Sequence, residues 1–91
     1  MNANDKRRLT RYRKATVAWL EYVKAVSKHD CSDLNVELVV TDDGFEYVRT
    51  DTISYRVQDE NRSYVRVTRT LVPTLDDLLV LLVRSGILQY R

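Results

Sequence analysis

The chain has 91 residues, of which 44% are hydrophobic and 31% are charged, and its formal net charge is +2. This length suits a single domain, residues 1–91, with one small core, and the composition argues against disordered and fibrous proteins. Because Cys31 is the sole cysteine, no disulfide can form within the chain, which agrees with a reducing compartment and makes the cytoplasm the expected location.

The sequence contains no segment typical of a membrane protein. The longest apolar run, from Leu78 to Val83, is far shorter than the about 20 residues that cross a bilayer. The polar and basic N-terminus is not followed by an apolar segment, so we expect no secretory signal. We therefore expect no association with a membrane.

The first predicted element is an amphipathic helix from about Asp5 to Lys28. Its apolar residues recur at spacings of three and four, and Thr16 lies on the same face. These residues are Leu9, Tyr12, Trp19, Leu20, Val23 and Val26. About 24 helical residues reach roughly 36 Å, whereas an eight-residue strand covers about 26 Å, so we expect the start of the helix to overhang the sheet.

Six cations fall within nine residues at the start of this helix, where the helix dipole disfavours positive charge. They are Lys6, Arg7, Arg8, Arg11, Arg13 and Lys14. Helical spacing places Arg7, Arg11 and Lys14 on one ridge. Lys6 and Arg13 form a second ridge, with Tyr12 between the two. Because a fold does not require such a cluster, we predict a surface that binds an acidic protein or the phosphates of a nucleic acid.

The same cluster is also compatible with a role that involves no partner. It could be a solvated face, or it could pair with acidic hairpins of the same chain. Residues 1–28 carry eight Lys or Arg against two acidic residues, whereas residues 29–62 carry nine acidic residues against three Arg. The molecule is therefore electrically polar, which can steer a charged partner.

The segment His29-Asp30-Cys31 combines three residue types that occur in catalytic sites. Adjacent residues seldom point at one atom, as a nucleophile, its base and the orienting group must, so we expect a plain loop. One His and one Cys also fall short of the four ligands of a zinc site. The chain has two isolated glycines, which excludes a glycine-rich phosphate loop. We therefore expect no enzymatic activity, no metal and no cofactor.

The predicted sheet begins at Leu34, where apolar and polar residues alternate as far as Val40. Residues 41–44 have the composition of a turn, because Gly44 can take the positive φ of a tight hairpin. A second strand follows over residues 45–58, and its alternation turns polar at residues 49–51, which admits a bulge there. A second turn at residues 59–62 leads to a return strand from residue 63 to about 72.

In the return strand we expect Val65, Val67 and Leu71 to point toward the core. The outward face of the sheet then carries Ser54, Arg56, Tyr64, Arg66, Thr68 and Thr70. Such a mixture could stack bases and bind phosphates. It is also an ordinary composition for an exposed strand, which is the commoner case.

A second helix is predicted to start at Pro73-Thr74 and to stop before Gly86. Thr74 suits the N-cap, Asp77 stands three residues later as in a capping box, and both Asp76 and Asp77 suit the positive end of the helix dipole. A core-facing stripe is supplied by Leu75, Leu78, Leu79, Leu82 and Val83.

The other side of this helix is also apolar. It carries Val80 and Leu81 together with Asp77 and Arg84, and a helix that is apolar nearly all round needs cover on both sides. We therefore predict a protein interface at these four residues, most simply a homodimer across a two-fold axis. The alternative is that the apolar tail from Ile87 to Tyr90 folds back over Val80 and Leu81.

The order helix, three-stranded antiparallel meander, helix predicts an α+β fold with both helices packed on one face of the sheet. This order resembles that of the double-stranded RNA-binding domain. The family places a lysine-rich cluster at the start of its second helix, where this chain has Thr74-Leu75-Asp76-Asp77, an acidic sequence that repels phosphate. The resemblance is therefore one of topology.

From these features we predict a small non-enzymatic protein-interaction module. It would self-associate or bind a partner through the second helix and present the basic first helix to an acidic partner. The alternative is a nucleic-acid-binding protein without sequence specificity that uses the same basic helix. No small-molecule substrate is expected. By analogy, small domains with one charged and one apolar surface are frequent among phage and mobile-element accessory proteins, including inhibitors of host defence enzymes.

Overall fold

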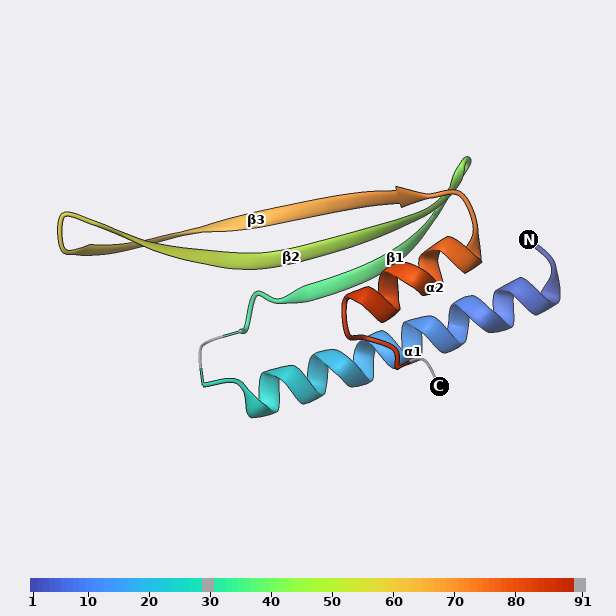
Figure 1. The fold of residues 1–91 in the computed structure, drawn as a ribbon, viewed down its shortest axis with the longest axis horizontal. Coiled ribbons are helices and arrows are strands. Elements are labelled where there is room, and N and C mark those ends of the chain that lie inside the picture. The colour runs from blue at the N-terminus through green and yellow to red at the C-terminus, as the bar shows by residue number, and fades with distance from the viewer. Residues whose placement is uncertain (29–30, 90–91) are drawn as a thin grey trace.

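The computed structural model describes residues 1–28 and 31–89, which form two helices and a three-stranded antiparallel sheet (Figure 1). The elements in chain order are α1 (Ala3–Val26), β1 (Asn35–Thr41), β2 (Gly44–Val57), β3 (Glu60–Val72) and α2 (Leu75–Arg84). The strands lie in the order β1-β2-β3. The predicted α+β fold and its order of elements are confirmed. Among the described residues, no helix is both long enough and apolar enough to cross a membrane.

Both helices begin at side-chain caps that satisfy free backbone N–H groups. The side chain of Asn2 accepts a hydrogen bond from the backbone N–H of Asp5 at 2.8 Å, so α1 starts two residues earlier than predicted. Thr74 Oγ1 accepts the N–H of Asp77 at 3.1 Å and donates to its carboxylate at 2.7 Å. The predicted start of α2 is therefore confirmed, and a cap of this kind contributes about 1 kcal/mol.

The sheet is a meander with an unbroken register. β2 pairs with β3 without interruption from Phe45 opposite Val72 to Val57 opposite Glu60, so the chain has no bulge at residues 49–51. The second turn was predicted at residues 59–62, and this was wrong: it consists of Gln58 and Asp59, with φ of 49° and 68°. Two residues with positive φ form the hairpin turn that best matches strand twist, so residues 60–62 are free to pair in β3.

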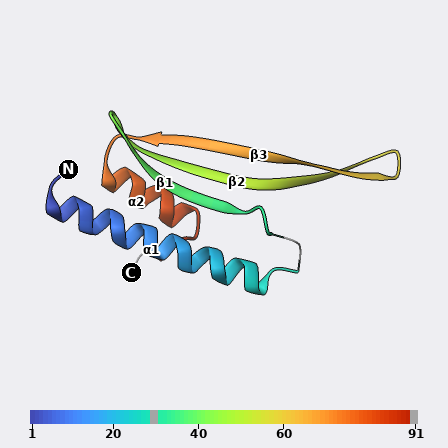
Figure 2. The same cartoon turned by 180° about the vertical axis from the view of Figure 1, so that it is seen from behind.

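α1 and α2 cover the same face of the sheet, and the opposite face carries no helix (Figures 1 and 2). α1 packs against β1, while α2 packs against β2, β3 and α1. The core between the two layers consists of Leu9, Tyr12, Val36, Leu38, Phe45, Tyr47, Leu75, Leu78, Leu82 and Ile87. This core contains no residue of β3.

The expected orientation of β3 is wrong. Directly paired residues point to the same face, and Phe45 and Tyr47, which face the helices, lie opposite Val72 and Thr70. Val65, Val67 and Leu71 therefore point away from the helices, and all three are exposed. The same register divides the predicted outward face, because Ser54 lies opposite Ser63 on one face and Tyr64 opposite Ile53 on the other.

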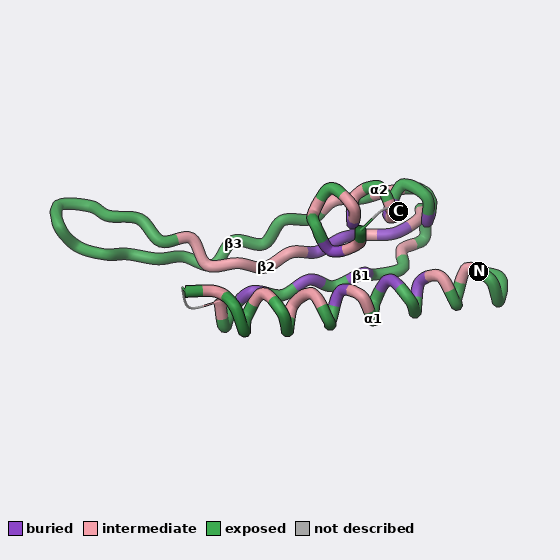
Figure 3. Tube along the Cα trace, turned by 60° about the horizontal axis from the view of Figure 1, so that its bottom comes forward, coloured by how far each residue is buried: buried purple, intermediate pink, exposed green. Residues whose placement is uncertain are grey.

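β2 and β3 continue well beyond the rest of the sheet. The pairing of β1 with β2 ends at Asn35 opposite Thr50, and the two longer strands run on as a ribbon over residues 51–66, here called the hairpin arm. Figure 3 shows that burial is concentrated where the helices lie against the sheet, and residues 54–66 are exposed throughout. The arm makes the molecule elongated, with extents of 53 × 27 × 19 Å.

Candidate protein-binding surface

Four of the six predicted cations gather on the outward side of α1. Lys6, Arg7, Arg11 and Lys14, here called the basic ridge, line a shallow depression together with Thr10. All four side chains are exposed, and within residues 1–28 and 31–89 none of the four forms an ion pair. Figure 1 shows this end of α1 reaching past the sheet, as expected, although β2 and β3, with 14 and 13 residues, are longer than the eight-residue strand on which that expectation rested.

Arg8 is not part of the ridge, because it joins the two helices. Its guanidinium donates to Asp76 at 2.7 Å and to the hydroxyl of Tyr12 at 2.9 Å. The hydrogen bond to Asp76, and then that to Tyr12, raise the pKa of Arg8 above its ordinary value. Because Asp76 is largely exposed, this ion pair contributes modestly to stability, about 0 to 1 kcal/mol.

Tyr12 lies on the apolar face of α1, as its spacing from Leu9 predicted, and not at the surface between two ridges. Its side chain is 1% exposed and belongs to the core, which explains why a tyrosine occupies the middle of a basic segment. The guanidinium groups of Arg8 and Arg11 lie 5.7 and 5.6 Å from the centroid of its ring. Tyr12 therefore makes cation–π contacts with two arginines, and its buried ring offers no stacking surface to a ligand.

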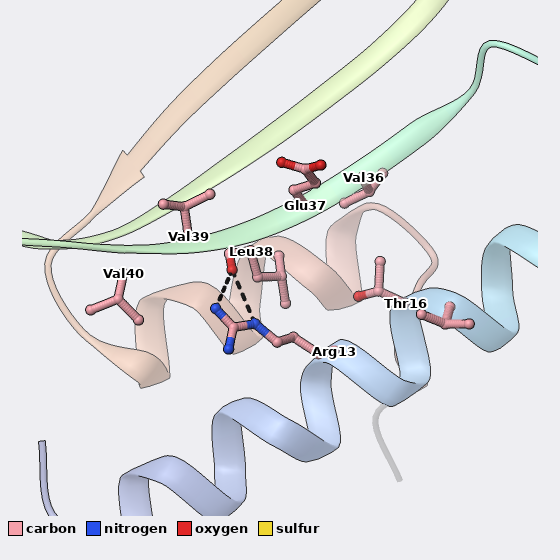
Figure 4. Close-up of a pocket in the computed structure, with 8 residues that line it drawn as sticks. Arg13, Thr16, Val36, Glu37, Leu38, Val39 and Val40 are labelled. Atoms are coloured by element: carbon pink, nitrogen blue, oxygen red, sulfur yellow. Dashed lines mark hydrogen bonds between the residues drawn. The ribbon is translucent and has the colours of Figure 1, made fainter.

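Arg13 reaches from α1 to the outer edge of β1. Its Nε and one terminal nitrogen donate to the backbone carbonyl of Leu38 at 3.1 and 2.7 Å (Figure 4). β1 is an edge strand, and the backbone groups on its side away from β2 have no strand beside them, which leaves room for a side chain of α1. The fold therefore employs two of the six predicted cations, Arg8 and Arg13, in hydrogen bonds of its own, and Arg11 contacts the ring of Tyr12.

A groove between α1 and β1 adjoins the basic ridge, and the sequence alone did not indicate it. It has a volume of about 430 Å³ and is lined by Arg13, Thr16, Val17, Val36, Glu37, Leu38, Val39 and Val40. Figure 4 shows side chains from both elements around it, with Arg13 crossing toward Leu38. A second depression shares Arg13 and Val17 with this groove and shares Thr10 and Lys14 with the ridge. An apolar groove and four cations thus form one continuous surface.

The predicted interface on α2 is smaller than expected. Leu81 is half-buried and packs against the core, which leaves Val80 exposed between Asp77 and Arg84. The tail docks on the core, because Ile87 is buried and the backbone N–H groups of Ile87 and Leu88 donate to the carbonyl of Leu82 at 3.0 and 3.2 Å, and Val80 stays exposed. Residue 90 of the predicted tail lies outside the described residues, and self-association through α2 stays a prediction.

The segment His29-Asp30-Cys31 is described in part. His29 and Asp30 lie outside the described residues, and the thiol of Cys31 donates to Ser27 Oγ at 3.2 Å. Within the described ranges, no group of three or more His, Cys, Asp or Glu side chains is placed to bind a metal ion.

Comparisons with protein-family models, curated proteins and solved structures give no match for this chain. The resemblance to the double-stranded RNA-binding domain therefore rests on the order of elements. At the start of α2 the two acidic side chains already have partners, since Asp76 binds Arg8 and Asp77 binds Thr74. Function must be argued from the surface itself.

Proposed function

We propose that this protein is a non-enzymatic interaction module that binds an acidic protein partner through the basic ridge and the α1–β1 groove. One observation carries the proposal: the four ridge cations have no ion pair within the described residues, whereas all five arginines of the sheet have one. The sheet pairs are Arg49–Asp51, Arg56–Asp59, Arg62–Glu60, Arg66–Asp51 and Arg69–Glu46.

The groove favours a protein over a nucleic acid as the partner. Val17, Val39 and Val40 line it and are exposed, so a partner that covers them must bring apolar groups. A protein segment can combine acidic side chains for the ridge with aliphatic side chains for the groove. A phosphate backbone offers charge alone, and the ridge spans about 12 Å of helix, which limits how many phosphates it can contact.

The surface of α2 is a second contact in this proposal. Val80 lies exposed between an acidic and a basic residue, an arrangement suited to the rim of an interface. An exposed valine contributes less than a buried anchor would, so we assign specificity to the ridge and the groove.

The test begins with selection of peptides by the intact protein from a random 12-residue library. We expect enriched peptides to combine Asp or Glu with Val, Leu or Ile. A labelled synthetic copy of one enriched peptide is then titrated by fluorescence anisotropy against two variants of equal charge change. Arg7→Glu/Lys14→Glu should weaken its binding at least tenfold, and Lys24→Glu/Lys28→Glu, in the last turn of α1 and just beyond its end, should not.

Two outcomes contradict the proposal. One is equal loss of binding in both double variants, which would mean that net charge matters and the ridge does not. The other is tighter binding to a labelled mixed-sequence DNA duplex than to the peptide at the same salt concentration. In that case the affinity for the duplex should fall by about 0.9 log unit per log unit of salt for each phosphate neutralised, and nucleic-acid binding would replace the proposal.

A further inference from the structure

The face of the sheet that points away from the helices is covered by neither helix and exposes apolar side chains of β3. The register places Val65, Val67 and Leu71 of β3 on this face, here called the valine face, and all three are exposed. Leu71 is 68% exposed and Val67 is 50% exposed, and Arg69 and Glu46 form an ion pair beside them. Exposed apolar side chains along one strand, on a face that neither helix covers, indicate a site of protein contact.

The hairpin arm exposes a second apolar surface. Ile53, Tyr55, Val57 and Tyr64 lie on the side of the arm that continues the core face, but no helix extends far enough to cover them (Figure 1). The rings of Tyr55 and Tyr64 form a tilted aromatic pair with centroids 6.0 Å apart. Tyrosines held in this way are frequent anchors of protein interfaces, because they contribute a large contact area with few flexible bonds.

The accessible surface of the molecule is larger than its mass predicts. A compact protein of this mass exposes about 5,500 Å², whereas this chain of 10.7 kDa exposes 6907 Å². Its radius of gyration is 15.3 Å, where a compact domain of this length has about 12 Å. If each of two chains buried its accessible surface in excess of the compact value, the interface would total roughly 2,800 Å². This area falls within the range of stable homodimers.

The charges of the β2–β3 hairpin favour a second copy of this chain as the partner that covers these apolar surfaces. Residues 44–72 carry five Arg and four acidic residues, so the hairpin has a net charge of +1, and each of these side chains belongs to an ion pair within it. A copy of this surface therefore meets little like-charge repulsion. The basic ridge, which would repel its own copy, lies on α1 on the other side of the sheet.

From area and charge together we infer that the chain forms a two-fold dimer in which the hairpin arm of each copy packs on the valine face of the other. The length of the arm matches the length of the sheet on which it would pack. In the arm, residues 51–57 of β2 extend about 24 Å beyond β1, and β1 itself has the same number of residues. The dimer buries the arm and the valine face and leaves the basic ridge of each copy free.

The experiment measures the mass of the intact protein by light scattering after size-exclusion chromatography, over a range of concentrations. We expect twice the chain mass of 10.7 kDa. Val67→Lys should give the monomer, and Val80→Lys on α2 should leave the dimer intact; the two valines are matched controls because they are 50% and 49% exposed. Tyr55→Ser/Tyr64→Ser, on the arm, should also give the monomer.

Each contrary result overturns the inference. A wild-type protein that is monomeric at several hundred micromolar has no such interface. A dimer that persists in both Val67→Lys and Tyr55→Ser/Tyr64→Ser does not use the valine face or the arm. A dimer that Val80→Lys splits and Val67→Lys does not would place self-association on α2. Circular dichroism of every variant should match the wild type, because all the substituted side chains are at least partly exposed.

Discussion

The basic ridge and the β2–β3 hairpin are both rich in arginine, but they use it in opposite ways. In the hairpin, every arginine lies within 3.5 Å of a carboxylate on the same strand, on the neighbouring strand or in the turn between them. On the ridge, cations follow one another along a helix, and no carboxylate is paired with them in the described ranges. The comparison teaches that the number of charges does not identify a binding surface; what matters is whether the fold has already paired them.

The largest expected difference between the two regions concerns their tyrosines. Tyr12→Ala should lower the free energy of unfolding by about 3 to 5 kcal/mol, because it removes a buried ring that also supports Arg8 and Arg11. Tyr64→Ala should lower it by about 1 kcal/mol, because that ring is 51% exposed and loses its contact with Tyr55. Urea denaturation measures both values. Equal losses would mean that the arm is part of the cooperative core.

Charge reversals should change stability in opposite directions in the two regions. Arg7→Glu replaces repulsion of Arg11 one turn later with attraction, so it should stabilise the protein by about 0.5 to 1 kcal/mol. Arg69→Glu removes the ion pair that Arg69 forms with Glu46 at 2.8 Å and places a second negative charge beside Glu46. It should therefore destabilise the protein. Thermal unfolding at low salt gives both signs. If Arg7→Glu also destabilised the protein, the ridge would have a structural role and would not be reserved for a partner.

The smallest expected effect tests the pairing within the hairpin directly. Glu46→Gln removes the charge that pairs with Arg69 and should lower the free energy of unfolding by about 0.5 kcal/mol. Glu21→Gln is the matched control, because Glu21 is exposed on α1 and has no ion pair within the described part of the chain. High salt should abolish the difference between the two variants, and a difference that survives in high salt would not come from the ion pair.

The order of elements follows from the sequence because it depends on local patterns. The spacing from Leu9 to Trp19, the alternation from Leu34 to Val40 and the cap at Thr74 each act within a few residues. The orientation of β3 does not follow from such patterns. Alternation indicates that the two faces of a strand differ, but it does not say which face the helices cover. In β3 that face is set by the pairing with β2, where Phe45 and Tyr47 point into the core.

The candidate site could be predicted in part for the same reason. Clustered cations are visible in the sequence, and helical spacing brings Arg7, Arg11 and Lys14 together. Which cations the fold uses depends on tertiary contacts, since Arg8 binds Asp76 at a separation of 68 residues and Arg13 binds Leu38 at a separation of 25. The α1–β1 groove is likewise a product of packing between distant segments, and no local pattern indicates it.

The contact of Arg13 with Leu38 has a consequence for how copies of the sheet could assemble. A sheet with two free edges can add strands at both, which leads to open-ended fibrils. In this chain the guanidinium of Arg13 is bound to the carbonyl of Leu38 in the middle of β1, so a strand that paired at this point would have to displace it. One side chain of a helix thereby protects one edge of the sheet against strand addition.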